Sequence, residues 1–403
     1  MERFDVLVVG GGQGGAQIAS ALRQQQFAGT IAIVSDEIDA PYERPALSKE
    51  YLAGEKTFEK MLLRPVAAWA DKKIELRLGK RVTEVDASAH TVTLEDGTAI
   101  AYGTLVWSTG GAPRKLSCSG HDWGGVHAIR TRADVDKLTS ELETKSTIVV
   151  IGGGYIGLEA AAVLSKLGKR VTIVEAMDRV LSRVAGEELS RFYEDEHRKH
   201  GVTLRLNAKV DRIEPTGVHL EGGEHLPCEI VIVGIGIAPA IEPLRAAGAK
   251  CPENGTGGVV VDLQCKTSLP DVFAIGDCAA HPSVHGDGRM IRLESIQNAN
   301  DQAAIVAKTI CGKTERYEAI PTFWSNQWDL KLQTIGLSHG YDATVVRGSI
   351  AERKFSIVYL RQGQVIAVDC VNAMKDYVQA RALIASGRTF DANALRQGEL
   401  KSL

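Results

Sequence analysis

The sequence predicts an α/β protein in which two βαβ units are followed by a smaller α+β region. The first two observations are the glycine-rich segments DVLVVGGGQGG at residues 5–15 and TIVVIGGGYIG at 147–157. Each is an apolar, β-branched run ending in glycines, and a helical pattern and a second apolar run follow it. The third is a change of character after about residue 317, where aromatic residues cluster and alternating strand patterns follow.

Each glycine turn has glycine at relative positions 1, 3 and 6, namely Gly10, Gly12 and Gly15, and again Gly152, Gly154 and Gly157. The first glycine permits a tight turn, the second lets a pyrophosphate approach the backbone, and the third lets helix and strand pack closely. The helix that follows presents free N–H groups and a partial positive charge to the phosphates. Two such turns in the same strand–helix–strand context predict two dinucleotide sites.

Acidic residues at the strand ends indicate which nucleotide binds. Glu175 lies 23 residues after Gly152, where a carboxylate accepts hydrogen bonds from a ribose 2′-OH and repels a 2′-phosphate. This favours NADH over NADPH, although Arg179 and Arg183 lie close enough in sequence to accommodate a phosphate. In the first unit Asp36 is the expected ribose ligand, with a solvated loop acid as the alternative.

The remaining segments give the domain organisation. Alternating patterns at 80–115 and 202–236 predict hairpin strands, with a turn at Glu95-Asp96-Gly97 in the first. Residues 259–280 predict a strand that runs into Gly276-Asp277, and 292–311 predict a helix. Residues 317–403 are expected to form a third, α+β domain.

The composition excludes several classes of protein. Of 403 residues, 44% are hydrophobic and 24% are charged, as in an ordinary globular protein. The net charge of −3 provides no basic field for nucleic acid, and no apolar run is long enough to span a membrane. The chain opens without a secretory leader and its seven cysteines are widely spaced, which predicts a cytoplasmic location.

With the two glycine turns, further segments carry a family resemblance: YERPALSK (42–49), GGGYIGLE (152–159), VFAIGDCA (272–279), RLESIQNA (292–299) and FWSNQW (323–328). The chain resembles the FAD-dependent NADH:ferredoxin reductases of bacterial oxygenase systems, the family of putidaredoxin reductase and biphenyl dioxygenase ferredoxin reductase. The resemblance implies an FAD-binding domain at 1–112 and 238–316. It also implies an inserted NAD-binding domain at 113–237 and a C-terminal domain at 317–403 that shields the flavin and docks ferredoxin.

The resemblance also implies two sets of cofactor-binding residues. The FAD set comprises Gly10, Gly12, Gly14, Gly15, Asp36, Lys49, Val82 (through its backbone), Arg130, Asp277, Ile296 and Trp324. The NADH set comprises Gly152, Gly154, Tyr155, Ile156, Gly157, Glu159, Glu175 and Arg183. Asp277 also has a case of its own, because a carboxylate after a strand-terminal glycine can bond ribityl hydroxyls; the alternative is a helix N-cap.

Lys49, Glu159 and Trp324 are the expected catalytic residues. A cation beside the flavin would stabilise the reduced ring, whereas Lys49 as a solvent-facing loop cation is the alternative. The resemblance makes Glu159 the partner of Lys49 near the nicotinamide, against an acid that merely favours the helix dipole. It places Trp324 against the flavin rather than in a core, and leaves Trp328 to packing.

The cysteines bear on the electron acceptor. Residues 1–117 contain no cysteine and no close pair occurs elsewhere, so a thiol relay is improbable, and Cys278 is expected to be buried packing. No metal site is predicted, because His197 and His200 fall in a charged stretch that indicates a solvated helix face. Without a thiol relay, electrons would leave the flavin singly, as an iron–sulfur partner requires.

The expected function is hydride transfer from NADH to FAD and single-electron transfer to a 2Fe–2S ferredoxin that feeds a terminal oxygenase. The alternatives are a rubredoxin reductase or general NADH:acceptor oxidoreductase, and a flavoprotein switched by NADH like apoptosis-inducing factor. An acidic ferredoxin would meet the cations Arg347, Arg353, Lys354 and Arg361, which could equally form a solvated strand face. The cognate ferredoxin, the oxygenase and the oligomeric state stay open.

Overall fold

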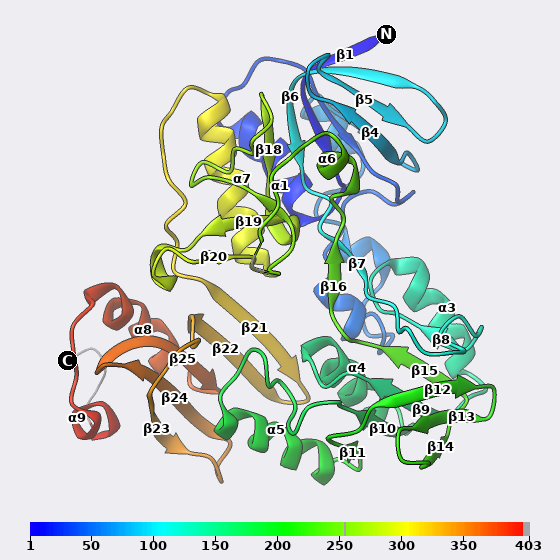
Figure 1. The fold of residues 1–403 in the computed structure, drawn as a ribbon, viewed down its shortest axis with the longest axis vertical. Helices are drawn as coiled ribbons and strands as arrows, with labels where there is room; N and C mark the ends of the chain where they lie inside the picture. The colour runs from blue at the N-terminus through cyan, green and yellow to red at the C-terminus, as the bar shows by residue number, and fades with distance from the viewer. Residues whose placement is uncertain (254, 398–403) are drawn as a thin grey trace. The chain divides into compact units, whose positions relative to one another are not determined.

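The computed structural model describes residues 1–397 except residue 254. The described chain folds into two compact units, each assembled from separate segments (Figure 1). Unit 1 comprises Met1–Glu43, Phe58–Ala112 and Ala238–Pro321. Unit 2 comprises Arg44–Thr57, Pro113–Ile237 and the chain from Thr322 onward.

Unit 1 is built on a seven-stranded sheet with the order β3-β2-β1-β6-β5-β4, in which β18 also pairs with β6. Its strands are β1 (Glu2–Val9), β2 (Ile31–Val34), β3 (Ile74–Arg77), β4 (Val82–Asp86), β5 (Thr91–Leu94), β6 (Ala99–Trp107) and β18 (Val272–Ala274). The β1, β2, β3, β6 and β18 strands run parallel, whereas β4 and β5 form an antiparallel hairpin joined to β6.

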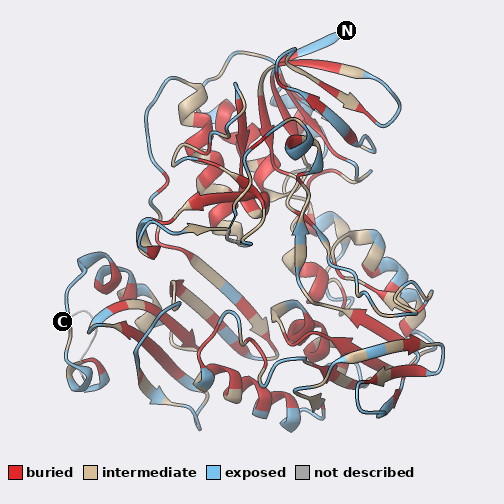
Figure 2. Ribbon diagram, viewed as in Figure 1, coloured by how far each residue is buried: buried red, intermediate tan, exposed pale blue. Residues whose placement is uncertain are grey.

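Two helices, α1 (Gln13–Gln24) and α7 (Ile296–Ile310), pack on one another and on one face of this sheet. Side chains alternate along β1, so Val6 and Val8 pack with the helices while Leu7 and Val9 join a second core on the opposite face. Figure 2 shows the later part of β1 as buried, whereas its start at the N-terminus is exposed. The shorter elements of unit 1 are η2 (Phe58–Met61), α2 (Ala67–Asp71), α6 (Glu242–Ala246), β17 (Val259–Val260), η3 (Gly276–Cys278), β19 (Ala279–Pro282), η4 (Val284–Gly286) and β20 (Met290–Ile291).

Unit 2 contains a second, five-stranded parallel sheet with the order β11-β10-β9-β15-β8. Its strands are β8 (Val126–His127), β9 (Thr147–Ile151), β10 (Arg170–Val174), β11 (Thr203–Arg205) and β15 (Ile230–Val233). Its helices are α3 (Arg132–Leu142), α4 (Tyr155–Lys166) and α5 (Glu187–Lys199). A small antiparallel sheet consists of β12 (Val210–Glu214), β13 (Gly217–Leu220) and β14 (His225–Pro227).

The C-terminal part of unit 2 is an antiparallel sheet with the order β21-β22-β25-β24-β23. Its elements are β21 (Thr322–Gln327), β22 (Leu330–Gly336), β23 (Ala343–Ser349), β24 (Lys354–Arg361), β25 (Gln364–Val371), α8 (Met374–Ser386) and α9 (Ala392–Gln397). Strand β21 and the short helix η1 (Pro45–Ser48) both contact α4, which brings three separate segments of chain together. Two of the boundaries between the units lie within β7 (Gly111–Pro113) and β16 (Ile237–Pro239), which pair with one another.

The structure confirms the predicted α/β class, both βαβ units, the hairpins at 80–115 and 202–236, and the helix within 292–311. The C-terminal region is α+β as expected, and its last six residues, 398–403, lie outside the described residues. The sequence did not indicate that residues 44–57 and the C-terminal sheet pack with the inserted region as one unit. Which cofactor each domain binds stays a prediction. None of the helices in the described chain is long and apolar enough to cross a membrane.

The packing of α4 against its glycine turn gives a test of the fold. A methyl group at Gly157 would overlap the backbone carbonyl of Gly152, so Gly157→Ala should destabilise the protein by about 2 kcal/mol. Gly154→Ala is the matched control, because its Cβ would meet only one protein atom within 4 Å, at 3.8 Å, and should cost less than about 1 kcal/mol. Thermal unfolding followed by circular dichroism measures both, and equal melting temperatures would contradict this account of the turn.

Candidate active site

The first and third glycines of each turn are required by the protein itself. Gly10 and Gly152 both have φ of +110°, and a Cβ on either would lie 2.5 Å from a backbone carbonyl oxygen at a neighbouring strand end. A Cβ on Gly15 or Gly157 would overlap the carbonyl oxygen of the first glycine of the same turn. These four glycines are therefore explained by backbone geometry and close helix–strand packing.

The middle glycines are different, because their backbone conformation does not require glycine. Gly12 and Gly154 have ordinary φ values of −81° and −80°. Around Gly154 a Cβ would meet only the Gly234 carbonyl oxygen, at 3.8 Å. Helices α1 and α4 begin directly after these glycines, and no described side chain caps either N-terminus. Uncapped N–H groups at both helix starts, with open space beside Gly154, fit a pyrophosphate.

Glu175 follows β10 and faces the second turn. Its Oε2 accepts the backbone N–H of Gly153 at 2.7 Å, and its Oε1 accepts that of Met177 at 2.8 Å. These bonds hold the half-buried carboxylate beside the glycine turn, with a lone pair left on each oxygen. The structure thus brings Glu175 to the turn where the sequence places a ribose.

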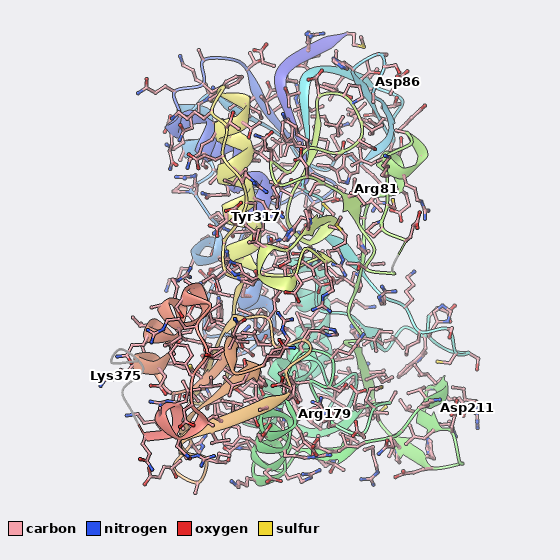
Figure 3. The ribbon with its side chains drawn as sticks, turned by 60° about the vertical axis from the view of Figure 1, so that its left-hand side comes forward. Arg81, Asp86, Arg179, Asp211, Tyr317 and Lys375 are labelled. Atoms are coloured by element: carbon pink, nitrogen blue, oxygen red, sulfur yellow. The ribbon has the colours of Figure 1, made fainter. Side chains whose placement is uncertain are left out.

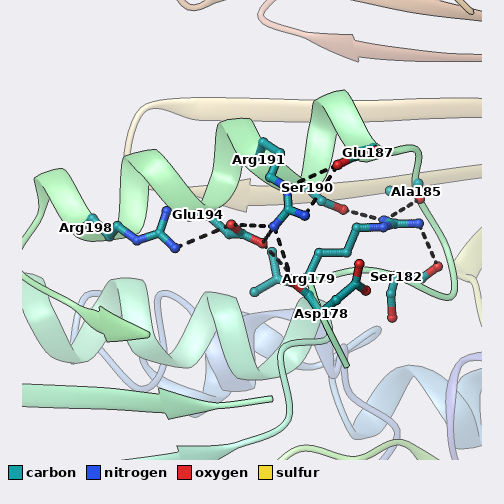
Figure 4. Close-up of polar contacts among 10 residues, drawn as sticks. Asp178, Arg179, Ser182, Ala185, Glu187, Ser190, Arg191, Glu194 and Arg198 are labelled. Carbon is teal, nitrogen blue, oxygen red and sulfur yellow. Dashed lines mark hydrogen bonds and ion pairs between the residues drawn. The ribbon is translucent and has the colours of Figure 1, made fainter. Parts of the chain in front are cut away.

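The two arginines after Glu175 have different environments, and Figure 4 shows the contacts of Arg179. The guanidinium of Arg179 donates to the carbonyl oxygens of Ala185 and Ser182 and to the Ser190 hydroxyl, at 3.0, 3.2 and 2.6 Å. Arg183 is exposed. Arg179 is therefore held by the protein, whereas the predicted role of Arg183 at a ligand stays a prediction.

In unit 1, Asp36 lies two residues after the end of β2 at Val34, and Ser35 occupies the position that matches Glu175 after β10. Its side chain is 55% exposed and pairs with Arg81, labelled in Figure 3, at 3.2 Å. The neighbouring Glu37 accepts a hydrogen bond from the Tyr42 hydroxyl at 2.6 Å. Asp36 is accessible to a ribose, although Arg81 competes for its carboxylate.

Lys49 and Glu159 form a buried ion pair within unit 2. The two side chains are 9% and 5% exposed, and Lys49 Nζ lies 2.5 Å from Glu159 Oε2. Lys49 Nζ also donates to the carbonyl oxygen of Pro45 at 3.0 Å. The solvent-facing alternative for Lys49 is therefore wrong, because η1 turns its side chain inward onto α4.

Two hydroxyls complete the environment of Glu159, and neither was predicted. Ser48 donates to Oε2 and Ser325, on β21, donates to Oε1, both at 2.6 Å. Ser325 is fully buried and follows Trp324, so its side chain points to the opposite face of the strand. The SNQ segment gave no signal for this role, which depends on β21 packing against α4.

Trp324 is 42% exposed, and Lys49 Nζ lies 5.1 Å from its ring centroid, within cation–π range. The alternative that Trp324 packs in a core is therefore wrong. A partly exposed indole beside a buried cation can stack on a flat ligand. Lys49, Glu159 and Trp324, expected together at the catalytic centre, are gathered by the fold of unit 2.

Tyr155 and Ile156 form the start of α4. The Tyr155 ring packs on Phe323 of β21, with centroids 4.4 Å apart, and burial raises the pKa of its hydroxyl well above the usual value. Ile156 is 47% exposed. At this helix start the Tyr155 side chain is therefore anchored in the protein, whereas the Ile156 side chain is open to a ligand.

The remaining predicted FAD residues come from both units. Gly14 lies in the first turn of α1, Val82 begins β4 and Ile296 begins α7, all in unit 1. Arg130 belongs to unit 2, where its carbonyl oxygen accepts from Arg44 at 2.7 Å. Asp277 lies inside the short helix η3 and is followed by β19, so the N-cap alternative is wrong.

The structure confirms the predicted packing of Cys278 and of Trp328 and corrects the prediction for His197. Cys278 is fully buried, and burial raises the pKa of its thiol to about 11, as a packing residue requires. His197 is not on a solvated face: it is fully buried, with Nε2 at 2.9 Å from Gln327 Oε1. His200 stacks on Trp328 with ring centroids 4.0 Å apart, which confirms packing for that tryptophan.

Two of the four cations considered for partner docking are engaged within unit 2. Arg347 is 11% exposed and pairs with Asp376 at 3.0 Å, while Arg353 pairs with Asp329 and Glu196. These ion pairs neutralise both guanidinium groups, so they are poor candidates for steering an acidic partner.

Comparison with known proteins places these features in a family. A family model described as pyridine nucleotide-disulphide oxidoreductase matches residues 4–303, and one described as reductase C-terminal matches residues 322–403. The chain is 56% identical to a ferredoxin–NAD(P)+ reductase of Sphingomonas sp., over 96% of this chain and 95% of that one. It superposes on the structure of a ferredoxin reductase from Rhodopseudomonas palustris with a TM-score of 0.94, 37% identity and 99% coverage of both chains. It also superposes on the structure of a covalent putidaredoxin reductase–putidaredoxin complex with a TM-score of 0.92 and 38% identity, covering 98% of this chain and 95% of that one.

The buried pair gives a test of the site. Lys49→Met should destabilise the protein by about 3–5 kcal/mol, because it leaves the Glu159 carboxylate buried without its cation. Adding Glu159→Gln should recover most of this loss. Lys166→Met, which removes an exposed pair with Glu55, is the control and should cost less than about 1 kcal/mol. Urea unfolding measures all three, and a Lys49→Met variant as stable as the control would disprove the buried pair.

Proposed function

Because the chain belongs to the pyridine nucleotide-disulphide oxidoreductase family, we propose that it is an oxidoreductase that moves electrons from NADH, through bound FAD, to an iron–sulfur ferredoxin. The observation that carries the proposal is the repetition of one nucleotide-binding turn in two units, with the same φ values and the same uncapped helix start. One turn serves each dinucleotide: FAD in unit 1 and NADH in unit 2.

The cofactor provides the redox chemistry, and the chain provides binding and electrostatics. The chemistry that FAD supplies when bound is acceptance of a hydride and release of single electrons. In unit 1 the N-terminus of α1 would hold its pyrophosphate, and Asp36, Val82, Asp277 and Ile296 are the proposed further contacts. The predicted approach of Lys49, Arg130 and Trp324 to the flavin stays a prediction.

In unit 2 the residues can bind and orient NADH. The N-terminus of α4 would hold the pyrophosphate, and Glu175 would accept the ribose hydroxyls. The Glu159 carboxylate, fixed by Lys49, Ser48 and Ser325, is an oriented acceptor for the nicotinamide carboxamide. Such preorganisation provides the orientation that hydride transfer requires, and no residue has to act as a general acid or base.

A small ferredoxin is the proposed electron acceptor, and a 2Fe–2S protein feeding a terminal oxygenase is the expected form. The relatives named above are ferredoxin reductases, and one of the superposed structures contains putidaredoxin. The cysteines support a route without thiols, because residues 1–117 contain none and four of the seven are buried. Free cysteines also favour the cytoplasm as the proposed location.

The decisive experiment is stopped-flow reduction by NADH followed by reoxidation with different acceptors. We expect rapid reduction of the flavin and rapid reoxidation by a 2Fe–2S ferredoxin, with rates unchanged after alkylation by iodoacetamide. Faster reoxidation by rubredoxin would make the protein a rubredoxin reductase. A long-lived charge-transfer complex that neither acceptor discharges would indicate an NADH-switched flavoprotein, and sensitivity to alkylation would indicate a thiol relay.

The nucleotide preference tests Glu175. Glu175→Gln keeps the side-chain shape and one backbone acceptor but removes the charge, so the KM for NADH should rise about tenfold and discrimination against NADPH should fall. Arg183→Ala is the companion variant and should not improve the use of NADPH. Steady-state reduction of ferricyanide with each nucleotide measures these constants. An unchanged preference in Glu175→Gln would remove this residue from the ribose site.

A further inference from the structure

The residue between the first and middle glycines of the second turn is held by the chain on both sides. The Gly153 N–H donates to Glu175, and the Gly153 carbonyl oxygen accepts the N–H of Leu181 at 2.9 Å. Val180 packs on the same residue, since a Cβ on Gly153 would lie 3.0 Å from its Cγ1. The segment that follows β10 therefore closes on the backbone of the turn.

The bond from Leu181 fixes the direction of one N–H group at the start of α4. The Gly153 carbonyl and the Gly154 N–H belong to the same trans peptide, in which the two groups point in opposite directions. Gly154 is the N-cap of α4, and the N–H groups of the N-cap and the first turn are those that no helical carbonyl accepts. The Leu181 N–H therefore orients a donor that can face a phosphate.

Leu181 does not take this position by its own preference. Its φ is +55°, in the left-handed region, which costs a leucine energy because its Cβ approaches the following carbonyl oxygen. Val180 and Leu181 are buried, although Met177, Asp178 and Arg183 around them are exposed. A buried dipeptide with a strained backbone in an exposed loop needs other contacts to hold it.

Arg179 supplies such contacts from within the same loop, residues 176–186 (Figure 4). Its guanidinium donates to the carbonyl oxygens of Ser182 and Ala185, which follow the buried dipeptide, and to the hydroxyl of Ser190 on α5. The side chain therefore joins the two halves of the loop and ties them to the helix. All three acceptors are uncharged, so the planar group with its several donors holds them by direction.

A carboxylate of α5 reaches the same loop. Glu194 is 2% exposed, and its Oε1 accepts the N–H of Val180 at 3.3 Å. Arg191 pairs with this carboxylate at 3.2 Å and donates to the carbonyl oxygen of Asp178, also at 3.2 Å. These contacts fix the first half of the loop on α5, whereas Arg179 joins the first half to the second. The closure of the loop therefore depends on Arg179.

We propose that Arg179 is a positioning residue for NADH: it closes loop 176–186, so that the Leu181 N–H holds the Gly153–Gly154 peptide in the orientation that a pyrophosphate requires. This inference rests on the proposed function of unit 2 as the NADH-binding unit. It gives Arg179 a role in nucleotide binding without contact with the nucleotide, in place of the phosphate ligand that its position in the sequence allows.

The test is the affinity of the FAD-loaded protein for NAD+, measured by isothermal titration calorimetry. Arg179→Met keeps the apolar part of the side chain and removes the guanidinium, and should raise the Kd about tenfold. Arg205→Met is the matched control, because Arg205 lies on β11 of the same sheet and makes an exposed pair with Glu224 at 2.9 Å. Its Kd should equal that of the wild type.

Ser190→Ala removes one acceptor of Arg179 and remains informative if Arg179→Met does not fold. Ser190 is fully buried on α5, so it cannot contact the nucleotide itself. The variant should raise the Kd about threefold. Adding it to Arg179→Met should weaken binding no further, because both changes act on the same interaction. Wild-type affinity in both single variants would overturn the proposal.

A comparison of NAD+ with NADP+ separates positioning from the other roles of an arginine. The pyrophosphate is common to both nucleotides, so Arg179→Met should raise both Kd values by the same factor. A loss confined to NADP+ would mean direct contact with the 2′-phosphate and would contradict positioning. A lower melting temperature with both Kd values unchanged in the folded protein would mean a merely structural role, which also contradicts it. A wild-type protein that binds neither nucleotide would overturn the proposed function of unit 2 instead.

Discussion

The assembly of unit 2 depends on the ion pair and hydrogen bonds that stabilise one buried carboxylate, that of Glu159. Glu159 lies on α4, and its partners come from elsewhere in the chain: Lys49 and Ser48 from η1, and Ser325 from β21. A carboxylate removed from water needs a cation and hydrogen-bond donors, so the three segments must meet at this point. This requirement accounts for a unit assembled from residues 44–57, the inserted region and the C-terminal sheet. The same carboxylate, fixed in direction by these donors, is the acceptor proposed for the nicotinamide carboxamide.

The two glycine turns have the same backbone geometry. In both, the glycines that the fold needs can be distinguished from the middle glycine. In each turn the first and third glycines are needed for positive φ or for close packing, whereas the middle glycine has an ordinary φ. Both helices begin with N–H groups that no described side chain caps, which is the arrangement that suits a phosphate. The differences lie at the strand ends, where Glu175 is locked by backbone N–H groups while Asp36 is exposed and paired with Arg81.

The C-terminal sheet acts on α4 at two neighbouring points. Ser325 of β21 donates to Glu159, and Phe323 of the same strand packs on the ring of Tyr155. Both contacts join the sheet directly to α4, so they bring it into the same compact unit as the helix. The C-terminal sheet therefore supports the helix that begins at the second glycine turn.

The sequence by itself determined the elements whose signals are local. Glycine spacing with β-branched runs predicted both turns, the alternating patterns predicted the hairpins, and Glu175 could be placed from its distance to Gly152. Only the tertiary structure decided that His197 is buried against Gln327, that Arg347 and Arg353 are neutralised, and that Ser48 and Ser325 donate to Glu159. The physical reason is that period and spacing report which backbone conformation a segment prefers, whereas the partner of a serine, histidine or aspartate depends on which distant segment packs against it.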